Sequence, residues 1–189
     1  LMVQQEFAAI CNKYAAEGTL AHALLERCLK DGSQPDQHIG EEIAGDKGTV
    51  GIVTEDMALA VRYATDWVRN RAEQCAGKII TERKVDILPN ISGTTDIAIV
   101  SAIDDTLIVA DYKHGAGVAV SAVENEQMQM YALGALERYG VFTDFETVAM
   151  AIDQPRIGNY IKPETTWTIS VEALREFGEV VRDGARLVH

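Results

Sequence analysis

An acid and a base stand two residues apart at the end of an apolar run in the stretch TLIVADYKHG, residues 106–115. Alternate residues of a strand point to the same face, so we expect Asp111 and Lys113 to face the same way. A second acid, Asp96, lies early in the preceding apolar segment, and Glu82 lies in the segment before that. Clustered carboxylates beside an amine can bind a divalent cation and orient water for hydrolysis.

These residues fall in a predicted three-stranded meander, made of residues 78–88, 94–102 and 106–113. In an antiparallel pair joined by a short turn, the start of one strand lies beside the end of the other. We therefore expect Asp96 and Asp111 to be neighbours. Lys113 should lie on the same side, and Glu82 should be within reach.

Such a group of acids needs a counter-charge. Two carboxylates about 4 Å apart repel by roughly 4 kcal/mol at an effective dielectric near 20. One lysine cannot offset three acids, so either a proton is shared or a divalent cation lies between them. Oxygen ligands of this kind suit Mg²⁺ or Mn²⁺. A D-x-K pair alone also fits an exposed ion pair, and both interpretations stay open at this point.

Helices and two further strands are expected around the meander. In the first part of the chain, the periodicity and the turn residues predict helices over 3–16 and 20–30 divided at Gly18 and Thr19, then a long loop over 31–53 and a helix capped by Thr54 that stops near Gly77. After the meander they predict a helix over 121–140, strands over 146–156 and 166–170, and a final helix capped by Ser170. This order predicts an α/β fold with a central mixed sheet of about five strands flanked by helices.

Two of these helices contain candidate polar site residues. Gln127 and Tyr131 are four residues apart and share a helix face, so their polar tips could reach the strand ends. His22 lies among small and apolar residues, where a histidine is either structural or a metal ligand.

The composition limits the partners. The chain has 189 residues, a net charge of −12 and a pI of about 4.7. This negative charge argues against a broad surface that binds nucleic acid, so phosphate would have to be held by local cations or by bound metal. No apolar run approaches the roughly 20 residues that span a bilayer, and no signal peptide is visible. We expect one domain over 1–189, with a helical part (1–76) and a sheet core (77–189), and we expect it to be a fragment with missing flanks.

From about residue 15 to its end, the chain resembles the RecB-like branch of the PD-(D/E)XK nuclease superfamily, especially its uncharacterised phage and prophage members. The likeness lies in five segments in the same order: AHALLE, TERKV, GTTDIAIV, DYKHGAG and ENEQMQMY. That branch includes the RecB and AddAB nuclease domains and CRISPR-associated exonucleases, with lambda exonuclease a more distant relative. The resemblance implies a restriction-endonuclease-like core in the order αβββαβ.

The resemblance also implies roles for individual residues. His22 matches a helical histidine that binds metal, and Asp96 matches the acid of the G-x-x-D strand, a metal ligand. Asp111 matches a metal-binding acid, and Lys113 matches the lysine that positions or activates the attacking water. The carbonyl of Tyr112 matches a further metal ligand.

Other matches concern the nucleic acid. Gln127 and Tyr131 match the Q-x-x-x-Y motif, which contacts DNA phosphate or supports the lysine, and Glu82 matches an acidic position one strand earlier. The cations expected to hold DNA are Arg62, Arg69, Arg71, Lys78, Arg83 and Lys84. Cys11, Cys28 and Cys75 lack the spacing of the iron–sulfur cluster found in several RecB-like nucleases, so we expect buried thiols and no cluster.

The expected function is therefore that of a DNA nuclease dependent on Mg²⁺ or Mn²⁺, most simply a cytoplasmic phage-type exonuclease in DNA recombination. Its expected substrate is a duplex end or a single strand, with a homo-oligomer or a single-strand annealing protein as further possible partners. A structure-specific or nicking endonuclease would use the same site. The alternative of another class is a non-cleaving DNA-binding or assembly module with the same fold.

Overall fold

A computed structural model describes residues 2–88, 91–101, 103–162 and 165–187 of the chain, and the side-chain environments of 13–46, 48–87, 92–101, 103–162 and 165–184. The chain divides into two compact units. The first comprises Leu1–Asp66, Tyr112–Ala119 and Gln154–Tyr160, and the second comprises Trp67–Asp111, Val120–Asp153 and Ile161–His189.

The first unit begins with one long helix, α1 (Met2–Asp31), in place of the two helices predicted on either side of Gly18 and Thr19. The helix continues because Thr19 satisfies its hydroxyl within the helix, where Oγ1 donates to the carbonyl of Ala15 at 3.1 Å. A single glycine costs a helix only about 1 kcal/mol. The predicted interruption was therefore wrong, since neither residue suffices to end the helix.

Residues 31–53 form more structure than the predicted loop. They contain the short helices η1 (Pro35–His38) and η2 (Asp46–Gly48) and the antiparallel strands β1 (Glu42–Ala44) and β2 (Val50–Ile52). The prediction failed because both strands have only three residues, too few to show a period. The hairpin packs on α1, since the Leu20 side chain occupies the space that a Cβ on Gly51 would need.

The helix α2 (Glu55–Gln74) begins at its predicted cap. The backbone N–H of Met57 donates to Thr54 Oγ1 at 3.2 Å, which satisfies one of the free donors of the first turn. The last part of α2 belongs to the second unit, where Arg71 forms an ion pair with Asp104 at 3.1 Å.

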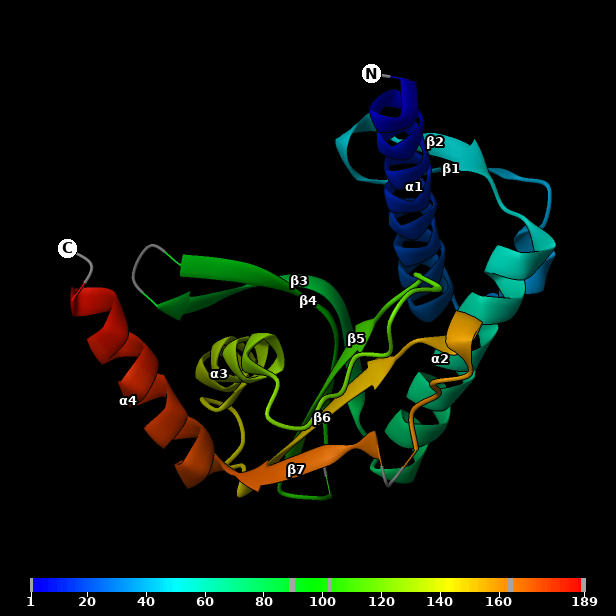
Figure 1. Ribbon diagram of the computed structural model, residues 1–189. Helices are drawn as coiled ribbons and strands as arrows, with labels where there is room; N and C mark the ends of the chain where they lie inside the picture. Colours follow the sequence, from blue (N-terminus) through cyan, green and yellow to red (C-terminus); the bar gives the residue numbers. More distant parts are fainter. Residues whose placement is uncertain (1, 89–90, 102, 163–164, 188–189) are drawn as a thin grey trace. The chain divides into compact units, whose positions relative to one another are not determined.

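The second unit is built on a five-stranded sheet in the order β3 (Lys78–Leu88), β4 (Ile91–Val100), β5 (Thr106–Tyr112), β6 (Thr147–Asp153) and β7 (Trp167–Ser170). The pairs β3–β4, β4–β5 and β6–β7 are antiparallel. The arrows of β5 and β6 run in the same direction (Figure 1), so the sheet is mixed. This confirms the predicted α/β fold with a mixed sheet of five strands flanked by helices. Ala102, the predicted last residue of the second strand, lies outside the described residues.

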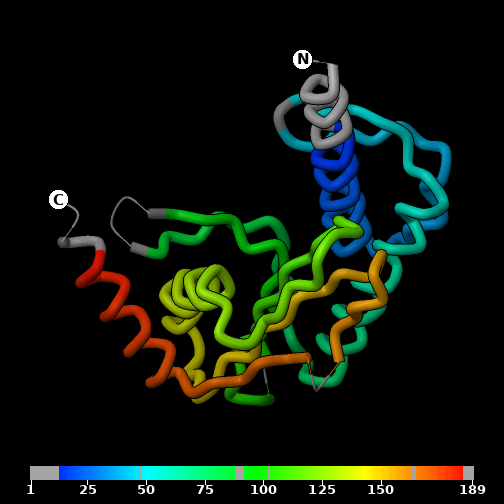
Figure 2. The backbone as a smooth tube through the Cα atoms, viewed as in Figure 1, coloured from blue at the N-terminus to red at the C-terminus, as the bar shows by residue number. Residues whose placement is uncertain are grey.

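The helices α3 (Glu126–Tyr139) and α4 (Val171–Leu187) bury their apolar faces with one side of this sheet. Both begin at a capping side chain: Asn125 Oδ1 accepts the N–H of Met128, and Ser170 Oγ accepts the N–H of Ala173, each at 3.1 Å. The tube in Figure 2 shows α3 lying in the curve of the long β3–β4 hairpin, where Gly134 of α3 contacts Val85. The packing of α3 thereby holds the β3–β4 hairpin in place on this side of the sheet.

Candidate metal centre

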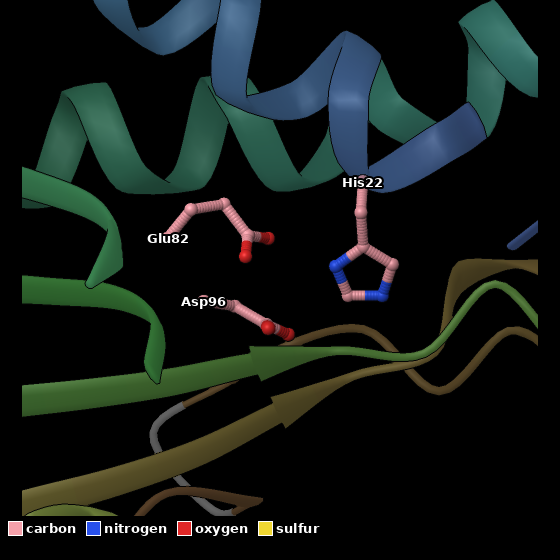
Figure 3. A group of neighbouring side chains, drawn as sticks. All are labelled: His22, Glu82 and Asp96. Carbon is pink, nitrogen blue, oxygen red and sulfur yellow. The ribbon is translucent and has the colours of Figure 1, made fainter. Parts of the chain in front are cut away.

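Glu82 and Asp96 face each other across the β3–β4 pair. The register pairs Thr81 with Ile97 and Arg83 with Thr95, which leaves Glu82 and Asp96 opposite one another. Both side chains are half-buried, and a carboxylate oxygen of each lies within 4.8 Å of the other. Figure 3 shows the two carboxylates on adjacent strands, drawn together with His22 of the first unit.

The backbone of β3 is irregular at Glu82. Its φ is +43°, in the left-handed region that residues with a side chain rarely adopt. Ile80 and Val85 both pack on the side of α3, although residues five apart in a regular strand face opposite sides. The strand must therefore reverse its faces between them, and Glu82 is the residue whose backbone conformation allows this. Backbone strain of this kind is concentrated at functional sites.

Two substitutions of Glu82 distinguish the effect of its carboxylate on stability from the effect of its backbone strain. Glu82→Ala removes the carboxylate and keeps a Cβ at positive φ, whereas Glu82→Gly removes both. We expect the glycine variant to be more stable than the alanine variant by about 1 kcal/mol, because glycine adopts positive φ without a steric penalty. Urea denaturation measures this difference. Equal stabilities would show that residue 82 is not strained.

Asp111 lies one strand further along. The β4–β5 register ends with Ile97 opposite Ala110, and one more step along it sets Asp96 opposite Asp111. Asp111 is buried, with 5% of its surface exposed. The two acids are thus neighbours in register, as expected from the meander. The carboxylate of Asp111 is not in the group of atoms within 4.8 Å that includes Glu82 and Asp96.

Tyr112, which follows Asp111, begins the segment of the first unit that contains Lys113 and His114. Its side chain is fully buried, and its hydroxyl lies 2.8 Å from Nδ1 of His114. The imidazole of His22 on α1 meets the Tyr112 ring edge-on, with 5.5 Å between ring centroids. Lys113 and His22 are half-buried. The predicted roles of Lys113 and of the Tyr112 carbonyl stay predictions.

The Q-x-x-x-Y pair forms the contact that helical spacing allows. Gln127 Nε2 donates to the Tyr131 hydroxyl at 2.8 Å. The Tyr131 ring occupies the space beside Gly93 of β4, where an added Cβ would lie 2.6 Å from it. Gly93 therefore lets α3 approach the strand that carries Asp96, and Gln127 remains exposed.

The six predicted DNA-binding cations differ in their surroundings. Arg62 pairs with Asp36, and Arg71 pairs with Asp104, both at 3.1 Å. The Arg62 pair is exposed, and exposed pairs are worth about 1 kcal/mol or less, so a phosphate could replace Asp36, whereas the Arg71 pair is half-buried. The three cations on β3 are exposed, namely Lys78, Arg83 and Lys84. Arg69 on α2 is half-buried. Arg83 and Lys84 directly follow Glu82 in the chain.

A buried acid that the sequence reasoning did not single out ends β6, the strand beside β5. Asp153 is 3% exposed, and its Oδ2 makes no hydrogen bond with any described residue. Burial raises the pKa of Asp153 from 3.8 to about 7, against the opposing effect of a hydrogen bond from the backbone of Ile161. In the sequence, Asp153 resembled only the last residue of an apolar strand.

The donors at Glu82 and Asp96 fit a hard divalent cation. Two oxygens bound to one Mg²⁺ at about 2.1 Å lie at most about 4.2 Å apart. The 4.8 Å limit between the carboxylate oxygens is thus close to the spacing that an ion requires, and rotation of one side chain would complete the adjustment. Two half-buried carboxylates at this distance also repel each other, which a bound cation would relieve.

The fold and this site define a class: a mixed α/β protein with paired carboxylates at a strand irregularity. The chain belongs to the family described as "Protein of unknown function (DUF2800)", which it matches over residues 2–188. A comparison with the solved structures finds no match. Within the described ranges, no helix has the length and apolar character needed to cross a membrane.

Proposed function

We propose that this chain is a metal-dependent DNA nuclease of the PD-(D/E)XK superfamily, in its RecB-like branch. The observation that carries the proposal is the pair of half-buried carboxylates of Glu82 and Asp96, within 4.8 Å of each other at a residue with positive φ. Asp111 in the next strand and Lys113 two residues later add the acid and the amine that phosphodiester hydrolysis requires.

Glu82, Asp96 and Asp111 would hold the ion, with His22 and the Tyr112 carbonyl as further ligands. Bound Mg²⁺ or Mn²⁺ polarises a phosphate and lowers the pKa of a bound water. The chain's own groups supply the remaining functions. The ammonium group of Lys113 orients the attacking water and offsets negative charge on the phosphate. Gln127 and Tyr131 are linked by a hydrogen bond, and the exposed Gln127 amide can donate to a phosphate oxygen.

Binding of DNA needs local cations, because the chain as a whole carries a charge of −12. Arg83 and Lys84 are exposed and follow Glu82 on β3, which makes them the first candidates for contact with a strand whose phosphate is at the site. We place the protein in the cytoplasm, where a phage-type exonuclease would act on DNA ends during recombination. A nicking endonuclease would cut covalently closed circular DNA, which an exonuclease leaves intact.

Substitution of the D-x-K pair tests the proposed function. Asp111→Ala and Lys113→Ala are each expected to remove Mg²⁺-dependent cleavage of end-labelled DNA by at least about 100-fold, while circular dichroism shows a folded chain. Lys162→Ala is the matched control, since it changes an exposed lysine to which the proposed function gives no role. Full activity in the folded Asp111 and Lys113 variants would exclude the proposal.

One observation favours a non-cleaving module as the second candidate. The carboxylate of Asp111 is outside the group of atoms within 4.8 Å that includes Glu82 and Asp96, so the three acids are not gathered around one ion position. Such a module has no need of a metal. A calorimetric Mn²⁺ titration that shows no binding would favour it, whereas binding that is lost in Asp96→Asn would favour the nuclease.

A further inference from the structure

His114 is a buried imidazole to which the proposed reaction gives no role. Only 4% of its surface is exposed, and it lies in the first unit between three segments: α1, the segment after β5, and the short helix η3 (Pro155–Ile157). Hydrogen bonds stabilise a polar ring at such a place, because a buried polar group without a partner is costly. The surroundings of its two nitrogens therefore indicate what the ring does.

Both nitrogens face polar groups. Nδ1 lies at hydrogen-bond distance, 2.8 Å, from the hydroxyl of Tyr112, whereas Nε2 lies 3.6 Å from Oε1 of Glu17, which is too long for a hydrogen bond. A neutral ring with its proton on Nε2 fits both, since Nδ1 can then accept the phenol proton while Nε2–H points toward the carboxylate. Burial lowers the pKa of His114, and the nearby Arg156 lowers it further, which favours this neutral form.

Two residues that follow β6, Gln154 and Arg156, contact this arrangement. The guanidinium of Arg156 lies 3.3 Å from the same Glu17 oxygen, so Glu17 is fixed between a cation and the imidazole. The buried amide of Gln154 donates to the carbonyls of Gly115 and Val118, each at 3.2 Å, and so fixes the segment that follows His114. The His114 ring is thus bordered by Glu17 and lies in a segment that Gln154 fixes.

Tyr112 connects His114 to His22. The Tyr112 ring is fully buried, and its only polar atom is bound to His114. The His22 imidazole meets that ring edge-on at 5.5 Å, a geometry that restricts how the imidazole can rotate. Groups that fix the orientation of a metal-binding histidine commonly change metal affinity by 10- to 100-fold when removed.

We propose that His114, bound to the Tyr112 hydroxyl and facing Glu17, is a positioning residue that fixes the Tyr112 ring and through it the imidazole of His22. The inference rests on the proposed function, in which His22 is a metal ligand. It assigns to His114, Glu17 and Arg156 one shared role, which is to preorganise that ligand before an ion binds.

The test compares two substitutions of His114. Asparagine can place an amide oxygen near the position of Nδ1 and keep the bond to Tyr112, whereas leucine cannot. We expect His114→Leu to weaken Mn²⁺ binding by about tenfold in calorimetry and His114→Asn to stay within about threefold of wild type. Tyr112→Phe, which keeps the ring and loses only the hydroxyl, should behave like His114→Leu and serves if the leucine variant does not fold.

A spectroscopic signature separates positioning from stability alone. Pulsed electron paramagnetic resonance of the Mn²⁺ complex should show coupling to an imidazole nitrogen in wild type, none in His22→Ala, and a changed coupling in His114→Leu and Tyr112→Phe. A role in stability alone would lower the unfolding temperature of both variants and leave affinity and coupling unchanged, which would overturn the inference. Unchanged coupling in His22→Ala would also overturn the inference, because His22 would then not bind the ion, and it would leave the proposed role of Glu82 and Asp96 intact. Absence of Mn²⁺ binding in wild type would reject the proposed function itself.

Discussion

Asp96→Asn is expected to lower metal-dependent DNA cleavage by about 1000-fold, which corresponds to roughly 4 kcal/mol of transition-state stabilisation. The amide keeps the shape of the side chain and removes the negative charge, so an ion at the site loses an anionic ligand. Without metal, the same change removes repulsion between Asp96 and Glu82, whose oxygens lie within 4.8 Å. The free energy of unfolding in a chelating buffer should therefore not fall.

Cleavage of end-labelled DNA and urea denaturation, measured on the same preparations, check both parts of this expectation. Asp86→Asn is the matched control, because Asp86 is an exposed acid on the same hairpin that pairs with Ser92. It should cleave like wild type. Cleavage within about threefold of wild type in Asp96→Asn would remove Asp96 from the site.

Asp153 should make the stability of the protein depend on pH in a direction unusual for an acid. Its pKa is raised from 3.8 to about 7, so between these values the folded chain holds a proton that the unfolded chain has released. Stability is then greatest below about pH 4 and is lost as the pH rises through about 7. The contribution of this one group is on the order of 4 kcal/mol.

Asp153→Asn should remove this dependence, because the amide is neutral at every pH and has nearly the same volume. The measurement is the urea midpoint of wild type and variant at intervals from pH 4 to pH 8. The variant should gain stability over wild type as the pH rises, with little difference at pH 4. A constant difference across the range would show that Asp153 is ionised in the folded chain at all of these values.

The sheet core was largely predictable from the sequence. Turn residues divide three apolar runs into strands, and alternation within the runs sets their faces, so the neighbourhood of Asp96 and Asp111 follows from the position of the turn. The caps of α2 and α4 were also predictable, since Thr54 and Ser170 bind backbone donors by local geometry that needs no tertiary contact.

The remaining features depend on contacts that a sequence does not display. Nothing in the alternating stretch around Glu82 signals a positive φ, because the reversal of faces is imposed by α3 packing on both Ile80 and Val85. His114 had only one signal, its place two residues after Tyr112. Its partner Glu17 lies about a hundred residues earlier in the chain, and only the fold brings the two together.

The cleavage of DNA by the wild-type chain tests the central claim most directly. End-labelled linear duplex and single strands would be incubated with the protein and Mn²⁺, with and without excess chelator, and resolved on a denaturing gel. The account predicts shortening of the labelled strand that requires the metal and disappears with chelator. Intact strands at every Mn²⁺ concentration, with a folded protein, would contradict it.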